Sequence, residues 1–483
     1  MRFVAIQRIV GVLLVLSSLT MVPPALVSIF FRDGSLIAFV DSAVLLAGIG
    51  ALAWWPVRNT RHELRLRDGF LVVATSWLVV GLCGALPLYV SQDPVLTMTD
   101  AVFESMSGLT TTGATVLTGI DDLPPAILYY RQQLQWIGGM GIIVLAVAIL
   151  PMLKIGGMQL YRAETPGPMK DSKLTPRITE TAKALWYIYL GLTSMCAFSY
   201  WVAGMSLFDA VTHAFSTVSI GGFSTHDLSL AWFDSGLIEG VAAVFMLLAG
   251  INFALHFMAW KQASKVPYLG DPELKAYFGI LLVVCLVCTL ALLLNGPHYG
   301  LFDAIRYGFF QGISAGTTTG FTTDAFYLWP AGLPLVLILA SFVGGCAGST
   351  GGGMKVIRVV LLYKQGMREI RRLIHPSAHF PVKMGDKSMH NRVIESVWGF
   401  FALYIACFGI MSMLLALSGI DLLTAVSAVA ACLNNLGPAL GEAGPHYGSV
   451  SDFGKWILTF AMLLGRLEVF TLLVLFTPTF WKD

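Results

Sequence analysis

Apolar runs long enough to cross a lipid bilayer recur along this chain, and they constrain its fold more than any other feature. A membrane-spanning helix needs about 20 consecutive, mainly apolar residues. Runs of this kind occur near residues 9–31, 35–55, 69–90, 133–153, 182–204, 236–260, 276–295, 333–363, 393–418 and 456–480. Hydrophobic residues make up 56% of the chain and charged residues only 12%, about half the charged share of an ordinary globular protein. We therefore predict an all-α polytopic membrane protein with about ten transmembrane helices, for which lipid is part of the solvent.

The same composition argues against several other classes of protein. A formal net charge of +2, without a long basic arm, does not indicate a nucleic-acid partner. Cys285 and Cys288 have CxxC spacing, but they lie inside an apolar run without a second pair, which favours packing over zinc binding. The first apolar run continues through Pro23 and Pro24 to Phe31, so we expect a retained helix rather than a cleaved signal peptide. No constellation of residues indicates catalysis, and we do not expect an enzyme.

Lysine and arginine are distributed unequally over the segments that connect the apolar runs. If both termini lie in the cytoplasm, 25 of the 30 basic residues fall on that side of the membrane. Arg32, Arg131, Arg306 and Lys455 fall outside, and Arg466 lies within an apolar run. Because positive residues accumulate in cytoplasmic loops, this asymmetry predicts a multi-pass protein with both termini in the cytoplasm.

Four of the outside segments contain a stretch that is partly apolar but too short to cross a membrane. These stretches are 99–110, 208–219, 302–317 and 422–434, and each runs into a polar string that contains glycine. Non-helical backbone at membrane depth is tolerated only where it lines a cavity or is buried in protein. A short helix and an extended polar string between two spans are typical of a re-entrant pore loop.

The four polar strings align on a glycine. We call them filter strings one to four: Thr110-Thr111-Thr112-Gly113, Ser219-Ile220-Gly221-Gly222, Thr317-Thr318-Thr319-Gly320 and Asn434-Asn435-Leu436-Gly437. Asp100, Asp209 and Thr424 precede the glycine by 13 positions in repeats one, two and four, and Asp303 precedes it by 17 in repeat three. The four extra residues amount to about one helical turn, so a longer pore helix absorbs them without moving the string.

This register divides the chain into two N-terminal helices, in residues 1–68, and four helix–pore loop–helix repeats. The expected repeats span residues 69–153, 154–260, 261–363 and 364–483, and the last of these segments includes a cytoplasmic loop. The second long helix of each repeat carries a pair of residues, mostly small, 24 to 29 positions after the glycine: Gly138-Gly139, Ala249-Gly250, Gly344-Gly345 and Gly465-Arg466. One such string alone is more often a turn, but four at matching positions favour a repeated pore loop.

The chemistry of the strings suits a dehydrated alkali cation. Rings of backbone carbonyl groups can replace the hydration shell of such an ion, and four strings on one axis supply four carbonyl groups in each layer. Glycine is needed where the backbone must adopt φ > 0 to direct its carbonyl group at the axis. The C-terminal ends of the short helices add partial negative charge, and the hydroxyl groups of Thr110, Ser219 and Thr317 are further candidate ligands at the inner end.

The four strings and the segment Gly-Gly-Cys-Ala-Gly-Ser-Thr-Gly-Gly-Gly-Met-Lys, residues 344–355, resemble the superfamily of bacterial Trk/Ktr and plant HKT potassium transporters. With its two additional N-terminal spans, the chain is similar to TrkH-type subunits over essentially its whole length. This resemblance implies a pseudo-fourfold pore, a homodimer, a cytoplasmic nucleotide-binding partner of the TrkA type and a bacterial inner membrane. Members with serine at the first filter glycine tend to pass Na⁺, so glycine at all four positions favours K⁺ as the transported ion.

A segment rich in small residues interrupts an apolar run below the third string. It comprises Gly344, Gly345, Cys346, Ala347, Gly348, Ser349, Thr350, Gly351, Gly352 and Gly353. One interpretation is a seam of small residues for helix packing. The other, which the resemblance supports, is a flexible intramembrane loop that acts as a gate.

Arg466 lies near the centre of the last apolar run. A lone charge at that depth costs at least about 2.5–3.5 kcal/mol, so it should face the pore or a partner. We expect Arg466 to reach carbonyl groups of the glycine-rich segment or to block the pore electrostatically, and an ion pair with another helix is the alternative. Glu104 and His213 share one aligned position on the first two pore helices, where we expect them to cap or orient those helices rather than move protons.

Three functions remain open from the sequence. The leading one is passive or gated K⁺ uptake. A proton- or sodium-coupled K⁺ symporter would require more carboxylates or histidines in the spans, which hold few: Glu239, Glu395 and Glu468. A membrane enzyme or scaffold would give no ion flux at all.

Overall fold

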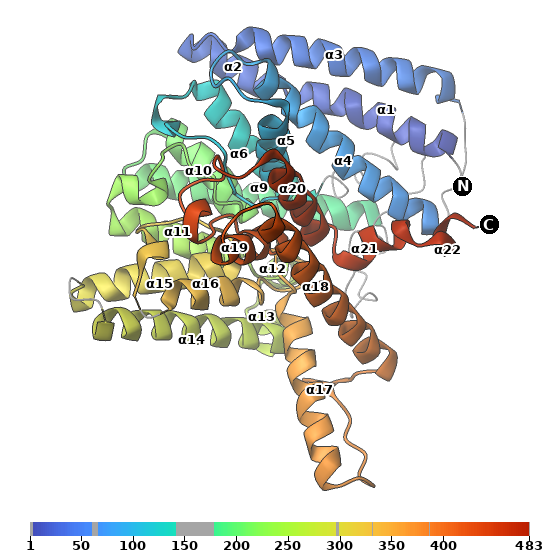
Figure 1. The fold of residues 1–483 in the computed structure, drawn as a ribbon, viewed down its shortest axis with the longest axis vertical. Helices are drawn as coiled ribbons and strands as arrows, with labels where there is room; N and C mark the ends of the chain where they lie inside the picture. Colours follow the sequence, from blue (N-terminus) through green and yellow to red (C-terminus); the bar gives the residue numbers. More distant parts are fainter. Residues whose placement is uncertain are drawn as a thin grey trace.

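The computed structural model describes residues 3–59, 66–141, 178–295, 299–330, 332–385 and 387–482. The chain is almost entirely helical, as the apolar runs predict (Figure 1). Its described strands are the two-residue pair β1 (Lys383–Met384) and β2 (Lys387–Ser388). Within the described ranges, five helices are long and apolar enough to span a membrane, or seven if each of two bent helix pairs counts as one span.

The N-terminal unit packs as a hairpin of α1 (Phe3–Leu19), α2 (Val22–Phe31) and α3 (Leu36–Trp54). Helices α1 and α3 cross closely, because a Cβ atom on Gly50 would lie 2.9 Å from the carbonyl oxygen of Gly11. Asp33 fastens the hairpin to the first repeat, since its Oδ2 accepts a hydrogen bond of 2.8 Å from the amide of Ala126.

The same succession of elements occurs four times after this unit: a long helix, a short pore helix and a second, often broken helix. The long helices are α4 (Leu66–Val90), α9 (Ile178–Val202), α14 (Pro272–Asn295) and α18 (Asn391–Leu417). The pore helices are α5 (Met98–Leu109), α10 (Leu207–Ser219), α15 (Leu301–Thr317) and α19 (Leu422–Leu433). Each pore helix begins within one residue of the stretch predicted for it. The third has 17 residues against 12 for the first, so the extra turn expected there is present.

Side-chain caps fix where three of these pore helices begin. The hydroxyl oxygens of Thr97 and Ser206 and the carboxylate of Asp421 accept a hydrogen bond from the backbone amide three residues later. Such caps satisfy amide groups that have no partner inside the helix. The helix register, and therefore the position of the filter string, is set at this end.

The second helices depart from the sequence prediction in two repeats. The expected single span 236–260 consists of α11 (Gly236–Ala249) and α12 (Phe253–Gln262), which meet at 90°. The expected span 456–480 consists of α20 (Asp452–Arg466) and a segment from α21 (Val469–Leu473) to Phe476, at 113°. The sequence stays apolar across both breaks, so each bent helix pair reads as a single apolar run. Both lie at the small pairs of residues identified above.

The remaining two second helices lie in repeats one and three. Helix α6 (Pro125–Gly139) begins eight residues before the span predicted at 133–153, whose last twelve residues lie outside the described ranges. The run 333–363 is broken, as its glycine content suggests, into α16 (Leu333–Ser341) and α17 (Val356–Ile374). Helix α17 projects away from the body of the molecule (Figure 1).

Candidate functional site: a ring of four filter strings

The four filter strings have the same backbone conformation. The residue two positions before each glycine is left-handed, with φ of 56° at Thr111, 57° at Ile220, 67° at Thr318 and 55° at Asn435. The glycines are left-handed too, with φ of 79°, 78°, 85° and 90° for Gly113, Gly222, Gly320 and Gly437. Non-glycine residues adopt this conformation rarely, so its recurrence at four aligned positions is a structural repeat.

The strings also lie side by side in a closed cycle. A Cβ atom on Gly113 would lie 2.2 Å from the carbonyl oxygen of Gly221, and one on Gly222 would lie 2.1 Å from that of Thr319. The cycle continues from Gly320 to Leu436 at 2.1 Å and closes from Gly437 to Thr112 at 2.5 Å. Each glycine therefore faces the carbonyl oxygen that precedes the glycine of the next repeat. Four hairpins far apart in sequence form one ring.

In each of the four repeats, an equivalent backbone hydrogen bond attaches the string to the end of its own pore helix. The amide of the residue before the glycine donates to the carbonyl oxygen five residues earlier, at 2.8 Å in all four repeats. The donors are Thr112, Gly221, Thr319 and Leu436, and the acceptors are Ser107, Ser216, Ser314 and Ala431. This bond turns the chain from the helix into the string and directs the negative end of the helix dipole towards the ring.

The hydroxyl groups predicted as ligands at the inner end of the strings are engaged with their own helices. Thr110 Oγ1 donates to Met106 O at 2.7 Å, and Thr317 Oγ1 donates to Ile313 O at 2.8 Å. Ser219 Oγ donates to Ser216 O at 3.2 Å. Because each hydroxyl oxygen keeps lone pairs after donating its proton, these contacts are compatible with a ligand role.

A buried ion pair supports the first two strings from behind. Arg131 Nε donates to Glu104 Oε1 at 2.8 Å, and Arg131 Nη1 donates to Ser224 O at 3.3 Å, in the segment that follows string two. The second carboxylate oxygen of Glu104 accepts from Val116 N at 3.0 Å, in the segment that follows string one. The charge count placed Arg131 outside the membrane, but it lies in the middle of α6 and is 1% exposed. A sequence signal existed, because the polar run 131–135 interrupts apolar sequence.

Glu104 and His213 each connect a pore helix to the extended segment that follows its filter string. His213 does so through its Nε2, 2.9 Å from Ser224 Oγ, while its Nδ1 lies 2.9 Å from Asp209 O in its own helix. Neither residue caps a helix end. Their common position therefore orients the pore helix relative to the segment after its string, as predicted, but does not cap the helix.

The glycine-rich segment lies directly against the base of strings three and four. Gly352 N donates to Thr318 Oγ1 at 2.7 Å, and Gly353 N donates to Asn434 O at 3.0 Å. Thr350 Oγ1 donates to Val218 O at 3.0 Å, at the end of the second pore helix. A Cβ atom on Gly352 would lie 2.0 Å from Asn434 O, so only glycine allows this approach. The segment therefore contacts parts of three repeats immediately beside the ring.

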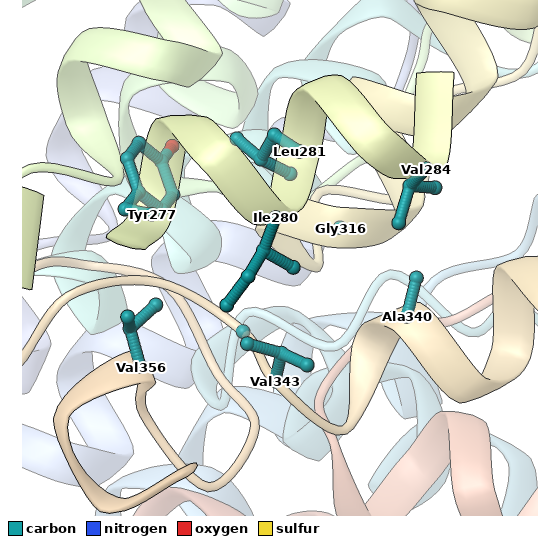
Figure 2. Close-up of a pocket in the computed structure, with 9 residues that line it drawn as sticks. Tyr277, Ile280, Leu281, Val284, Gly316, Ala340, Val343 and Val356 are labelled. Atoms are coloured by element: carbon teal, nitrogen blue, oxygen red, sulfur yellow. The ribbon is translucent and has the colours of Figure 1, made fainter. Parts of the chain in front are cut away.

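Helix α14 contacts both the segment and the residues that flank it. Glu273 Oε1, at the start of α14, accepts from Ala347 N at 2.7 Å and from Ile357 N at 3.1 Å. Figure 2 shows a narrow crevice between α14 and the segment, where Tyr277 and Ile280 face Val343 and Val356. The residues that flank the segment thus line an apolar crevice, while Gly352 and Gly353, at its C-terminal end, bond to the strings.

Arg466 joins the segment to the ring. Its Nη1 donates to Thr350 O at 2.9 Å and to Thr111 Oγ1 at 3.1 Å. Its Nη2 donates to the carbonyl oxygens of Gly138 at 2.6 Å and Gly139 at 2.9 Å, at the end of α6. The expected contact with a carbonyl group of the glycine-rich segment is present, and Glu468 instead pairs with Arg358.

Ionic contacts also join neighbouring repeats around the ring. Lys455 Nζ lies 2.6 Å from Asp100 Oδ1, and Arg306 Nη2 lies 2.8 Å from Glu239 Oε1. His226 Nδ1, in the loop after string two, lies 2.5 Å from Asp121 Oδ1.

The position of His226 sets its protonation. Its ring is stacked on Trp232 with centroids 3.7 Å apart. Burial lowers the pKa of His226, but two carboxylates outweigh this: that of Asp209, 3.6 Å from Nε2, and that of Asp121, hydrogen-bonded to Nδ1. The pKa of His226 is therefore raised above the ordinary 6.5. The two carboxylates therefore favour the protonated ring at this contact between the two loops.

Comparison with known proteins agrees with this geometry. The family model "TrkH: Cation transport protein" matches residues 35–482. The chain is 55% identical over 485 residues to the Trk system potassium uptake protein TrkH of Vibrio parahaemolyticus, and 52% identical over 483 residues to that of Escherichia coli (strain K12), with 100% of each chain covered.

The structural comparison gives the same answer. The crystal structure of the potassium transporter TrkH from Vibrio parahaemolyticus matches with a TM-score of 0.91 at 52% identity, covering 100% of both chains. These relatives are named as transport proteins and not as enzymes. The chain belongs to the TrkH family of cation transport proteins.

Proposed function

We propose that this chain takes up K⁺ across the bacterial inner membrane through the ring of the four filter strings. The observation that carries the proposal is the closed cycle of glycine and carbonyl contacts that joins Gly113, Gly222, Gly320 and Gly437. The names of the relatives, which are potassium uptake proteins, support K⁺ as the transported ion.

The carbonyl oxygens of the strings take over from water around the ion. The ion-binding residues are all sixteen members of the strings, from Thr110–Gly113 to Asn434–Gly437. A membrane potential of about 100 mV, inside negative, supplies about 2.3 kcal/mol for each charge, enough for roughly fortyfold accumulation. A passive pore therefore needs no coupling ion.

The segment Gly344–Gly353 and Arg466 form the gate. Arg466 places a positive charge within hydrogen-bond distance of Thr111 in string one, and it also holds the segment through Thr350. A cation leaving the ring on this side meets both the backbone of the segment and this charge. Flux requires that the segment move away from strings three and four.

Movement of the gate is coupled to a cytoplasmic partner. We assign both termini and α17 to the cytoplasmic side, where the basic residues Arg368, Arg371 and Arg372 lie on the projecting helix. The segment continues directly into α17, so a partner that binds this helix can act on the gate. A nucleotide-binding subunit of the TrkA type and a homodimer of this chain complete the proposal, which the name "Trk system" of the relatives supports.

Flux measurements in proteoliposomes test the function. The purified chain should carry K⁺ with a reversal potential that follows the K⁺ gradient and does not change when a pH or Na⁺ gradient is imposed. A reversal potential that shifts with either gradient would identify a coupled symporter. The absence of any cation flux, with and without the partner, would exclude both mechanisms.

A further inference from the structure

String two lacks a side chain where the other three strings have one. The residue before the filter glycine is Thr112 in string one, Thr319 in string three and Leu436 in string four, but Gly221 in string two. Backbone conformation does not require this glycine, because Gly222 is left-handed and Gly221 is not. Some feature other than φ must therefore explain its presence.

The side chain of Gln135 occupies the space beside Gly221. A Cβ atom on Gly221 would lie 2.4 Å from Cδ of Gln135 and 2.5 Å from its Oε1. Gln135 belongs to α6 of repeat one, 86 residues away in sequence, and it is 0% exposed. The carboxamide thus fills the position that a side chain of string two would otherwise take.

Gln135 also makes the polar contacts of a built-in support. Its Nε2 donates to Gly221 O at 2.6 Å, and its Oε1 accepts from Phe223 N at 3.1 Å. One turn away, Gln132 Nε2 donates to Phe223 O at 3.2 Å. Helix α6 therefore holds the backbone of string two from Gly221 to Phe223, and Gly221 O is the carbonyl oxygen that faces Gly113.

We propose that Gln135 is a positioning residue for ion selectivity, which acts as the missing side chain of string two. The inference rests on the function proposed above, because it concerns the same ring. Strings one and three position themselves partly through their own hydroxyl groups, with Thr110 Oγ1 and Thr112 Oγ1 at 2.8 Å and Thr317 Oγ1 and Thr319 Oγ1 at 2.8 Å. String two is positioned instead by Gln135, a side chain of repeat one.

The two residues should behave as a pair. In Gln135→Met the volume is nearly kept, but Phe223 N and Gly221 O lose their partners. In Gly221→Ala the new methyl group displaces the carboxamide and breaks the same contacts. In the double variant Gly221→Ala with Gln135→Ala the steric conflict is removed, so the losses should not add.

The test is the ratio of K⁺ to Na⁺ flux in proteoliposomes for each variant. We expect a roughly tenfold loss of discrimination for Gln135→Met, as two ordinary hydrogen bonds are lost, with total cation flux largely kept. Gly221→Ala should lose as much discrimination between K⁺ and Na⁺, and the double variant should lose no more discrimination than either single variant. The control is Gln133→Met, two residues away on α6, since Gln133 Nε2 donates to Thr20 O in the N-terminal hairpin at 2.7 Å and not to a string.

The outcomes separate this inference from the proposed function. Unchanged selectivity in Gln135→Met, or equal losses in Gln135→Met and Gln133→Met, would overturn the inference while wild-type K⁺ flux upheld the function. Additive losses in the double variant would also overturn it. If Gln135→Met does not fold, Gly221→Ala gives the same readout, because the three atoms nearest its new methyl group all belong to the flexible end of Gln135.

Discussion

The closure of the ring can be tested with one methyl group. Gly113 has φ of 79°, and Gly119, six residues later in the loop of the same repeat, has φ of 66°. Alanine at either position adopts a left-handed conformation, which costs about 1–2 kcal/mol. The two sites differ in their surroundings, because the new Cβ atom would meet Gly221 O at 2.2 Å in one case and nothing within 4 Å in the other.

Only Gly113→Ala must therefore deform the ring. An ordinary contact begins at 3.4 Å, so string one or string two has to move by about 1 Å. Such a displacement moves some carbonyl oxygens away from an ion that all of them must contact at the same time. We therefore expect the ratio of K⁺ to Na⁺ flux to fall at least tenfold, equivalent to about 1.4 kcal/mol. Discrimination against Na⁺ should be lost before transport itself.

The assay is flux into proteoliposomes, beside a thermal unfolding curve of each variant in detergent. Gly119→Ala should lower the unfolding temperature as much as Gly113→Ala does, or less. Its ratio of K⁺ to Na⁺ flux should remain that of wild type. If Gly113→Ala kept wild-type selectivity, or if Gly119→Ala lost as much, the contact with Gly221 would not shape the ion path and the reasoning would fail.

Three further predictions concern the charges around the ring. Arg466→Gln removes the cation that joins Thr350 to the ring, so unregulated K⁺ leak should rise, and unchanged leak in vesicles would remove Arg466 from the gate. His226 has a raised pKa, so its ion pair with Asp121 contributes stability that is full below about pH 6.5 and is lost as pH rises through the raised value. The pair is partly exposed, so the advantage of wild type over His226→Gln in unfolding curves should be greater at pH 6 than at pH 9 by under about 1 kcal/mol. Lys455→Met leaves the carboxylate of Asp100 without its cationic partner, so the unfolding temperature should fall measurably. The double variant that adds Asp100→Asn should recover part of the lost unfolding temperature.

The sequence alone carried much of this fold, because its main constraints are local. A pore helix such as α5 (Met98–Leu109) follows from a short apolar stretch after a threonine cap, and its glycine string follows from the register of four repeats. Even the longer third pore helix was predictable, since an insertion of one helical turn leaves both of its ends in place.

What could not be predicted depends on contacts between repeats. The bend of 113° after Arg466 lies inside an apolar run, and hydropathy has no term for direction. Gln135 and Arg131 read as the polar edge of a span, because their partners Gly221, in string two, and Ser224, just after it, lie about ninety positions away. Periodicity reports neighbours on one helix, and it cannot show which distant segment that helix supports.

Anomalous diffraction from crystals grown in Rb⁺, a substitute for K⁺, tests the central claim most directly. The account predicts density on the axis enclosed by the four filter strings, between the carbonyl oxygens of Thr111, Ile220, Thr318 and Asn435, and its loss when Na⁺ replaces Rb⁺. Density confined to other parts of the molecule, or equal occupancy by both ions, would contradict a ring that recognises the larger cation.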